Sequence, residues 1–130
     1  MKKIPVKEAA GAIAGAEDFK AGDLYGMVWQ SDSPLHPVAR RIDSMPTDEG
    51  DALLRVMKVR QELPKGIAPA SHPDALFYIV SSYGVPIAWI THDGTIQRTK
   101  MRHSDATAKH IDLALKGLLV LSAKLVGKPS

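Results

Sequence analysis

The stretch "SYGVPIAWITHDGTIQRTKMRHSDATAKH", residues 82–110, carries the clearest information about the fold. Asp93-Gly94 is among the strongest short signals for a β-hairpin, because a type I′ turn needs positive φ angles that Asp and Gly tolerate. The runs on either side, 85–91 and 95–102, have the composition of strands. Pro86 cannot donate to a strand ladder, so its end of the first strand should lie at a sheet edge or a bulge.

A long helix should follow this hairpin. Ser104 is a favourable N-cap, Asp105 complements the positive helix end, and Gly127 and Pro129 stop the helix. Its apolar residues recur at helical spacing and widen beyond one face with Leu113, Leu119 and Val120. Such a helix is typical of a central position or of a contact with a second subunit, so a homodimer through the C-terminal helix is one expectation.

Upstream of residue 82, two further strands are expected at 24–29 and 76–82. In the first, Leu24 and Val28 should face one side, and Tyr25, Met27 and Trp29 the other. The segment "KAGD", 20–23, has the composition of a turn. A helix of about 11 residues should begin at Pro5, which suits a first helical position.

Residues 30–74 differ from the rest and contain six of the nine prolines. We expect two helices there. One should run from about Pro37 to Met45. The other should begin after Thr47, with acidic residues in its first turn, and end near Leu63, because Pro64 and Gly66 stop it.

These elements predict a single α+β domain covering residues 1–130. A small, mainly antiparallel sheet of three to four strands should have the N- and C-terminal helices on one face. Residues 30–74 should form a helical insertion at a side or an edge of this sheet.

Composition narrows the class of protein. The chain has 130 residues, 45% of them apolar, and no cysteine, which excludes disulfides, thiolate metal sites and cysteine nucleophiles. No apolar run reaches the roughly 20 residues that span a bilayer, and the N-terminus lacks the apolar core of a secretory signal. We therefore expect a cytoplasmic protein. Net charge is +3, and residues 91–130 carry 7 Lys and Arg against 3 Asp and Glu.

The basic residues of the last predicted strand are the first candidate site. Side chains alternate along a strand, so Arg98, Lys100 and Arg102 should share one face, roughly 6.6–6.8 Å apart. They could follow a nucleic-acid backbone or meet an acidic protein surface, although a solvent-facing strand is often basic simply to prevent edge pairing. Among the aromatic residues, Trp89 and Tyr83 could extend such a partner-binding surface, or the aromatic residues could pack in the core.

Motifs for catalysis or metal binding are missing from the sequence. There is no G-x-S-x-G, S-x-x-K or Gly-rich phosphate loop, and no H-x-x-x-H or H-E-x-x-H pair. The sequence therefore predicts no catalytic residues, metal or cofactor, although an enzyme whose site gathers distant residues stays open.

The stretch 82–110 resembles the signature of a family of short phage, prophage and bacterial proteins to which no activity is attached. In that family a "YxTPIA" strand and a hairpin precede a Tyr-Ser-x-Thr-Thr-x-x-His helix start. The matching positions are Tyr83, Pro86, Ile87, Ala88, Ser104, Thr107 and His110, with Phe19, Gly22 and Leu24 matching an upstream Phe-x-x-Gly-x-Leu. The match covers about 19–28 and 76–112, and Val85, His103 and Ala106 depart from it.

This resemblance implies a small accessory protein of a mobile element. The favoured function is non-catalytic binding of a host protein, including inhibition of a bacterial antiphage defence system. The alternative is a nucleic-acid-binding protein that uses the basic strand 98–102. Ser104, Thr107 and His110 lie at i, i+3 and i+6 of the helix start, where they could form a polar cluster that is either a binding pocket or a structural contact.

Overall fold

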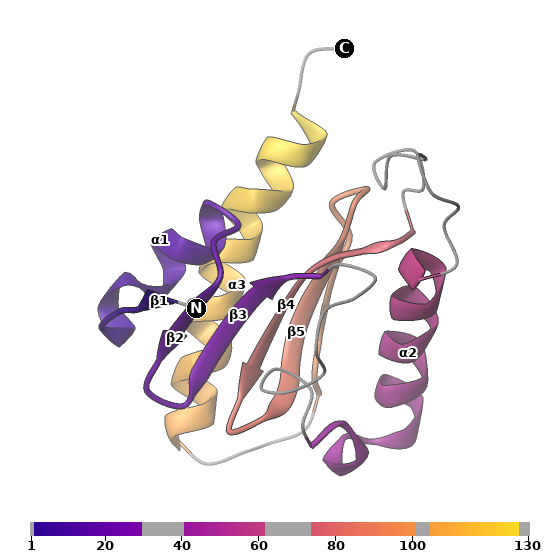
Figure 1. The fold of residues 1–130 in the computed structure, drawn as a ribbon, viewed down its shortest axis with the longest axis horizontal. Coiled ribbons are helices and arrows are strands. Elements are labelled where there is room, and N and C mark those ends of the chain that lie inside the picture. Colours follow the sequence, from indigo (N-terminus) through magenta and orange to yellow (C-terminus); the bar gives the residue numbers. More distant parts are fainter. Residues whose placement is uncertain (1, 30–40, 62–73, 101–104, 128–130) are drawn as a thin grey trace.

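The two strands predicted around Asp93 are present and belong to a larger sheet (Figure 1). The computed structural model describes residues 2–29, 41–61, 74–100 and 105–127. Within these residues the sheet has six strands in chain order: β1 (Lys2–Lys3), β2 (Phe19–Ala21), β3 (Leu24–Val28), β4 (Leu76–Ser82), β5 (Val85–Thr91) and β6 (Ile96–Arg98). β1 pairs parallel with β2, and every later pair is antiparallel. The expected α+β class with a mainly antiparallel sheet is confirmed, while the strand count exceeds the predicted three to four.

The extra strands come from the N-terminal region. β2 includes Lys20 and Ala21 of the expected turn 20–23, so the turn itself consists only of Gly22 and Asp23. Through these two residues β2 forms a tight hairpin with β3, and Gly22 has φ +62°. β1 has only two residues, whose alternation is too short to show in a sequence.

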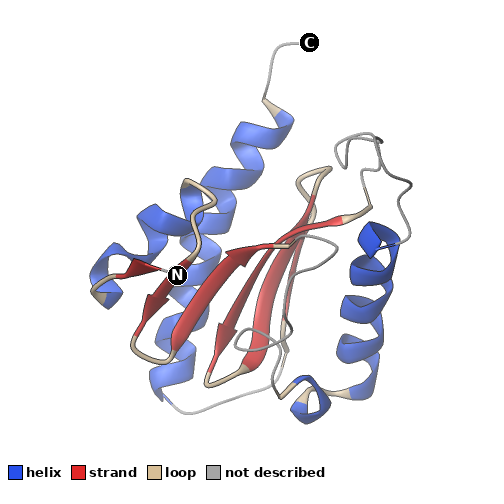
Figure 2. Cartoon of the chain, viewed as in Figure 1, coloured by secondary structure: helices blue, strands red, loops and turns tan. Residues whose placement is uncertain are grey.

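In the described ranges, three α-helices cover the sheet from both sides (Figure 2). On one face lie α1 (Ala9–Ala14), preceded by a 3₁₀ turn η1 (Val6–Glu8), and α3 (Asp105–Val126). On the opposite face lies α2 (Thr47–Gln61). The placement of the N- and C-terminal helices on one face is confirmed. α2, the part of the predicted insertion that the structure describes as an α-helix, covers this second face, where Leu53 and Met57 pack in a core against the sheet.

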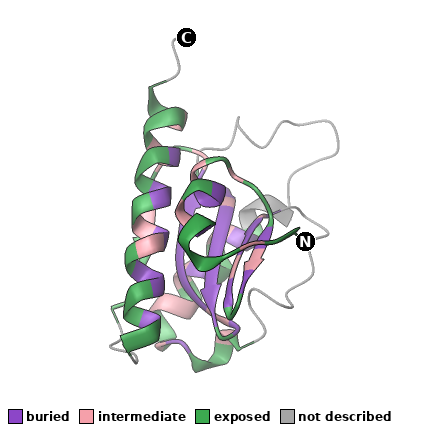
Figure 3. Ribbon diagram, turned by 90° about the vertical axis from the view of Figure 1, so that its left-hand side faces the viewer, coloured by how far each residue is buried: buried purple, intermediate pink, exposed green. Residues whose placement is uncertain are grey.

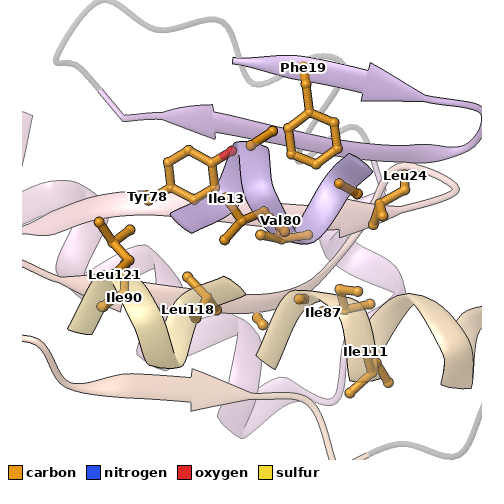
Figure 4. Close-up of a cluster of buried hydrophobic side chains, with 14 of the residues drawn as sticks. Ile13, Phe19, Leu24, Tyr78, Val80, Ile87, Ile90, Ile111, Leu118 and Leu121 are labelled. Carbon is orange, nitrogen blue, oxygen red and sulfur yellow. The ribbon is translucent and has the colours of Figure 1, made fainter. Parts of the chain in front are cut away.

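Strand alternation divides the interior into two cores. Leu24 and Val28 face α1 and α3, whereas Tyr25, Met27 and Trp29 face α2, as the sequence predicted. Buried positions line the inner surfaces of α1, α3 and the sheet, and the outer side of α3 is exposed (Figure 3). Figure 4 shows the first core, where Ile13 lies among side chains of the sheet and of α3.

α1 and α3 approach each other closely at Gly117. A Cβ atom added there would lie 2.6 Å from Cβ of Ile13 and 2.7 Å from the carbonyl oxygen of Ala10. Lys124 Nζ donates to the carbonyl oxygen of Ala14, 2.8 Å away, at the C-terminal end of α1. Glycine in the middle of α3 is therefore explained by the helix that crosses it.

The tight turns differ from the prediction in detail. Thr91 N–H donates to Thr95 O at 3.1 Å, so the β5–β6 hairpin has a three-residue loop, in which only Gly94 has a positive φ. The type I′ pattern of two positive φ angles occurs instead at Tyr83 and Gly84, between β4 and β5. The bulge expected near Pro86 is confirmed, because the β4–β5 register shifts between Val80 and Ser81.

The predicted helix 37–45 is wrong where the structure describes it. Only a short 3₁₀ turn η2 (Ile42–Ser44) forms there, and residues 37–40 lie outside the described ranges. Met45 is extended, with φ −77° and ψ 153°. Pro46 explains this, because a residue before proline is driven away from helical angles.

Candidate functional site

β6 forms one end of the sheet, and two of the three predicted cations are described there, Arg98 at its last position and Lys100 just beyond it. Arg98 and Lys100 are exposed, and Thr99 between them is buried, as strand alternation predicts. Arg102 lies outside the described residues. β6 itself spans only Ile96–Arg98, so the predicted strand 95–102 is shorter in the structure.

The backbone register decides which groups of β6 face outward. Thr91 N–H donates to Thr95 O, and Thr99 N–H donates to Ile87 O at 2.8 Å. In an antiparallel pair these hydrogen-bonded positions recur every two residues. Gln97 therefore shares its backbone groups with β5, and the N–H and C=O groups of Ile96 and Arg98 point away from the sheet.

Glu49 of α2 lies beside Lys100, the next residue after Arg98 whose backbone N–H points away from β5. Its carboxylate accepts from Lys100 N–H, with Oε2 2.9 Å from the nitrogen. Oε1 of the same carboxylate is buried and has no hydrogen-bond partner in the described structure. A side-chain oxygen of α2 thus accepts from Lys100 N–H, the outward donor just beyond β6. The outward backbone groups of Ile96 and Arg98 lie before it, at the edge of the sheet.

The sequence left two positions open for Trp89, a partner-binding surface and the core, and the structure places it in the core. It is 1% exposed and packs in the core beneath α2, because it faces the same side of the sheet as Met27 and Ile79. A partner cannot reach more than the edge of its indole. That edge lines a cavity of about 270 Å³, and the other lining residues come from α2, β5, β6 and the connections around them: Ala52, Arg55, Val56, Asp74, Thr91, Asp93, Thr95 and Gln97.

Tyr83 is the predicted aromatic that does reach the surface. Its side chain is 41% exposed, and its φ of +54° is unfavourable for a residue other than glycine. Tyr83 N–H donates to the carbonyl oxygen of Asp23, 2.9 Å away, which joins the two hairpin turns at this end of the sheet. Its ring centroid lies 6.0 Å from that of His110.

The predicted polar cluster forms only in part, and it includes a residue that the sequence did not indicate. Thr107 and His110 lie on the buried side of α3, whereas Ser104 lies outside the described residues. Ser82, at the end of β4, completes the group. Its Oγ is 2.7 Å from His110 Nδ1 and 3.4 Å from Thr107 Oγ1.

The environment keeps His110 neutral over a wider pH range than an exposed histidine. Burial lowers its pKa below the usual value, and the negative charge of Asp23 opposes part of this effect. A serine next to a neutral imidazole is the pair that nucleophilic hydrolases use. Here Ser82 is 2% exposed and His110 8%, so a substrate cannot reach the hydroxyl in this conformation. In this conformation the side-chain hydrogen bonds of the cluster link α3 to the end of β4.

The described parts of the chain contain neither a metal-binding group of side chains nor a membrane-spanning helix. Among them, no group of three or more His, Asp or Glu side chains could hold a metal ion. No helix in the same ranges is both long enough and apolar enough to cross a membrane. On the outer side of α3, Leu119 and Val120 are exposed, and the homodimer through this helix stays a prediction.

Comparison with known proteins adds no family or function. No protein-family model, curated protein or solved structure matches the chain.

Proposed function

We propose that this chain acts without catalysis, by binding another protein at the edge of its sheet formed by β6. The observation that supports this best is an outward edge at which the backbone groups of Ile96 and Arg98 have no partner among the described residues, together with the exposed cations Arg98 and Lys100. An exposed strand edge is a ready template for pairing with another chain. The only neighbouring outward donor that the described structure satisfies is that of Lys100, through a carboxylate.

The resemblance to phage and prophage proteins favours a host protein as the partner, including a component of an antiphage defence system. Inhibition by occupancy needs only affinity and a blocked surface, which a chain of this size can supply. A standard interface needs about 800 Å² from each partner, and the accessible surface of the chain is 7298 Å². An edge with the adjoining surface of α2 would use about a tenth of it.

Affinity purification of the tagged chain from bacterial cells, with and without nuclease, tests this proposal. We expect the same protein to be recovered in both conditions. The Arg98→Glu/Lys100→Glu double variant should reduce its recovery at least about tenfold, because two attractions become repulsions. The matched control is Lys109→Glu/Lys116→Glu, which makes the same charge change at exposed positions of α3 and should leave recovery unchanged.

The alternative partner, a nucleic acid, has its own outcome in this experiment. It predicts recovery that nuclease abolishes and an affinity that falls steeply with salt, because counterions are released from phosphates. The buried position of Trp89 speaks against it, since the indole cannot stack on a base. Recovery of nucleic acid alone, or equal loss in both double variants, would contradict the proposal of a protein partner bound at β6.

A further inference from the structure

We propose that the partner supplies an extended segment that adds to β6 as a seventh, antiparallel strand, and that acidic and apolar residues alternate in this segment. This inference rests on the proposed function and specifies its mode of binding and the chemistry of the partner. Strand addition to an open sheet edge is a recurring mode of peptide recognition, in which backbone hydrogen bonds supply affinity and alternate side chains supply specificity.

The hydrogen-bonding groups for the added strand are already in place. Ile96 and Arg98 each direct one N–H and one C=O away from β5, as the hydrogen-bonded positions at Thr95 and Thr99 require. These four groups match the two hydrogen-bonded pairs that an antiparallel strand of about five residues would make. Glu49 already accepts from Lys100 N–H, so backbone pairing should end at Arg98, and the residue of the added strand opposite Lys100 should contribute its side chain alone.

Charge selects one side of the added strand. Arg98 lies opposite Ala88, which belongs to the core under α1 and α3, so Arg98 extends from this side of the sheet. A residue of the added strand directly opposite Arg98 would have its Cβ about 4.5–5.5 Å from that of Arg98. Lys100 is the next residue of the same parity. Acidic side chains opposite Arg98 and Lys100 would therefore be stabilised, and basic ones repelled.

Shape selects the other side. Gln97 lies opposite Trp89, and both side chains line the cavity of about 270 Å³ beneath α2. This volume is just below the lower end of the range for small-molecule pockets, which begins at about 300 Å³, and it suits one large apolar side chain better than a whole ligand. A residue of the added strand opposite Gln97 would face the same side, where its side chain could lean over Gln97 towards the indole edge of Trp89.

The two requirements together define a short pattern. Read along the added strand from Lys100 towards Ile96, it is acidic, any residue, acidic, apolar. Asp93 lies beyond the other end of β6, beside the cavity, so a further acidic residue at that end should be disfavoured.

The probe is a synthetic peptide, acetyl-Ser-Glu-Val-Glu-Phe-Thr-Ser-amide with a fluorescent label, titrated with the full chain by anisotropy. We expect saturable binding, and at least about tenfold weaker binding when lysine replaces both glutamates. N-methylation of the second glutamate removes a donor that faces β6, so affinity should fall at least about tenfold. N-methylation of the phenylalanine is the matched control, because its N–H would face away, and affinity should change little.

Substitutions of Arg98 distinguish the contribution of its charge from that of its backbone N–H. Arg98→Gln removes the charge and keeps the N–H, so binding should weaken about threefold. Arg98→Pro also removes the outward N–H, while sparing every β5–β6 hydrogen bond, so a further loss of about tenfold is expected. Ala52→Leu narrows the cavity and should weaken the phenylalanine peptide but not the same peptide with alanine in that position.

Amide hydrogen exchange identifies the edge directly. The amides of Ile96 and Arg98 should exchange fast in the free chain and at least about tenfold more slowly when the peptide is bound. Gln97, which already pairs with β5, should change little. The proposal is overturned if the peptide does not bind, if N-methylation weakens binding equally at both positions, or if protection appears elsewhere.

Failure of strand addition can be told apart from failure of the proposed function. If nuclease-resistant recovery of a protein still depends on Arg98 and Lys100, but the peptide shows no strand-like pattern, the partner binds β6 through another kind of surface. If purification returns only nucleic acid, the proposed function itself is overturned.

Discussion

Replacing Gly117 by alanine tests the closest contact between α1 and α3. The added Cβ would lie 2.6 Å from Cβ of Ile13 and 2.7 Å from the carbonyl oxygen of Ala10. Carbon atoms in ordinary contact are about 3.5–4.0 Å apart. Neither obstacle can rotate away, since one is a backbone atom and the other is attached to the backbone. α1 must therefore move by about 1 Å relative to α3, and this movement disturbs the core between them.

Two effects of opposite sign determine the magnitude. Overfilling a packed interior costs about 1–3 kcal/mol, whereas alanine in place of glycine favours a helix by about 1 kcal/mol. The free energy of unfolding is therefore expected to fall by up to about 2 kcal/mol. For a chain of this length, a fall of about 2 kcal/mol corresponds to a Tm lower by about 6–10 °C.

Gly11→Ala is the matched control, because it is the same substitution in the other helix of the contact. A Cβ at Gly11 meets nothing within 4 Å, so this variant should be more stable by about 0.5–1 kcal/mol. Urea unfolding followed by circular dichroism measures both variants. If Gly117→Ala stabilised the protein as Gly11→Ala does, the described crossing of α1 and α3 would be wrong.

Three further substitutions test the polar groups of the interior and the turn. The pKa of His110 is lowered in the folded state, so its contribution to stability is complete above its unfolded pKa of about 6.5 and is lost as pH falls through the folded value. The free energy of unfolding, measured from pH 7.5 to 5, should therefore fall more steeply for the native chain than for His110→Gln. Parallel curves for the two proteins would refute this reasoning. Tyr78→Phe removes the hydrogen bond from Tyr78 Oη to the carbonyl oxygen of Glu17, 2.6 Å away, and should cost about 1–2 kcal/mol in urea unfolding, whereas no loss would show that water replaces it. Tyr83→Asn relieves the strain of a positive φ angle at this position and should raise the free energy of unfolding by about 0.5–1 kcal/mol. A measured decrease would show that the lost ring contact with His110 contributes more than this strain.

Local patterns account for the parts of the fold that the sequence predicts. The hairpin at Asp93, the two-sided strand β3 and the helix after Ser104 depend on turn residues, alternation and capping that act over a few positions. β1 depends instead on long-range pairing, since its residues pair with residues of β2 that lie seventeen positions further along the chain. β2 has only three residues, too few for strand alternation to show in the sequence. The face on which α2 lies was equally inaccessible, because apolar residues such as Leu53 could pack against either side of a sheet.

The candidate site divides in the same way. Alternation was sufficient to place Arg98 and Lys100 on an exposed face. It could not show that Trp89 is covered by α2, or that Ser82 meets His110, because each contact joins elements that lie far apart in the sequence. A serine at the end of a strand has no local feature that marks it as the partner of a histidine 28 residues later.

The direction of the backbone groups on β6 is the feature least accessible to sequence reasoning, and it is the one on which the proposed interaction depends. A shift of one residue in the β5–β6 register would turn the N–H groups of Ile96 and Arg98 towards β5 and leave that of Gln97 outward. The same shift would move Arg98 to the face covered by α2. The hydrogen bond from Thr99 to Ile87, together with that from Lys100 to Glu49, excludes this arrangement. Backbone pairing and charge therefore point to the same edge, because one register determines both.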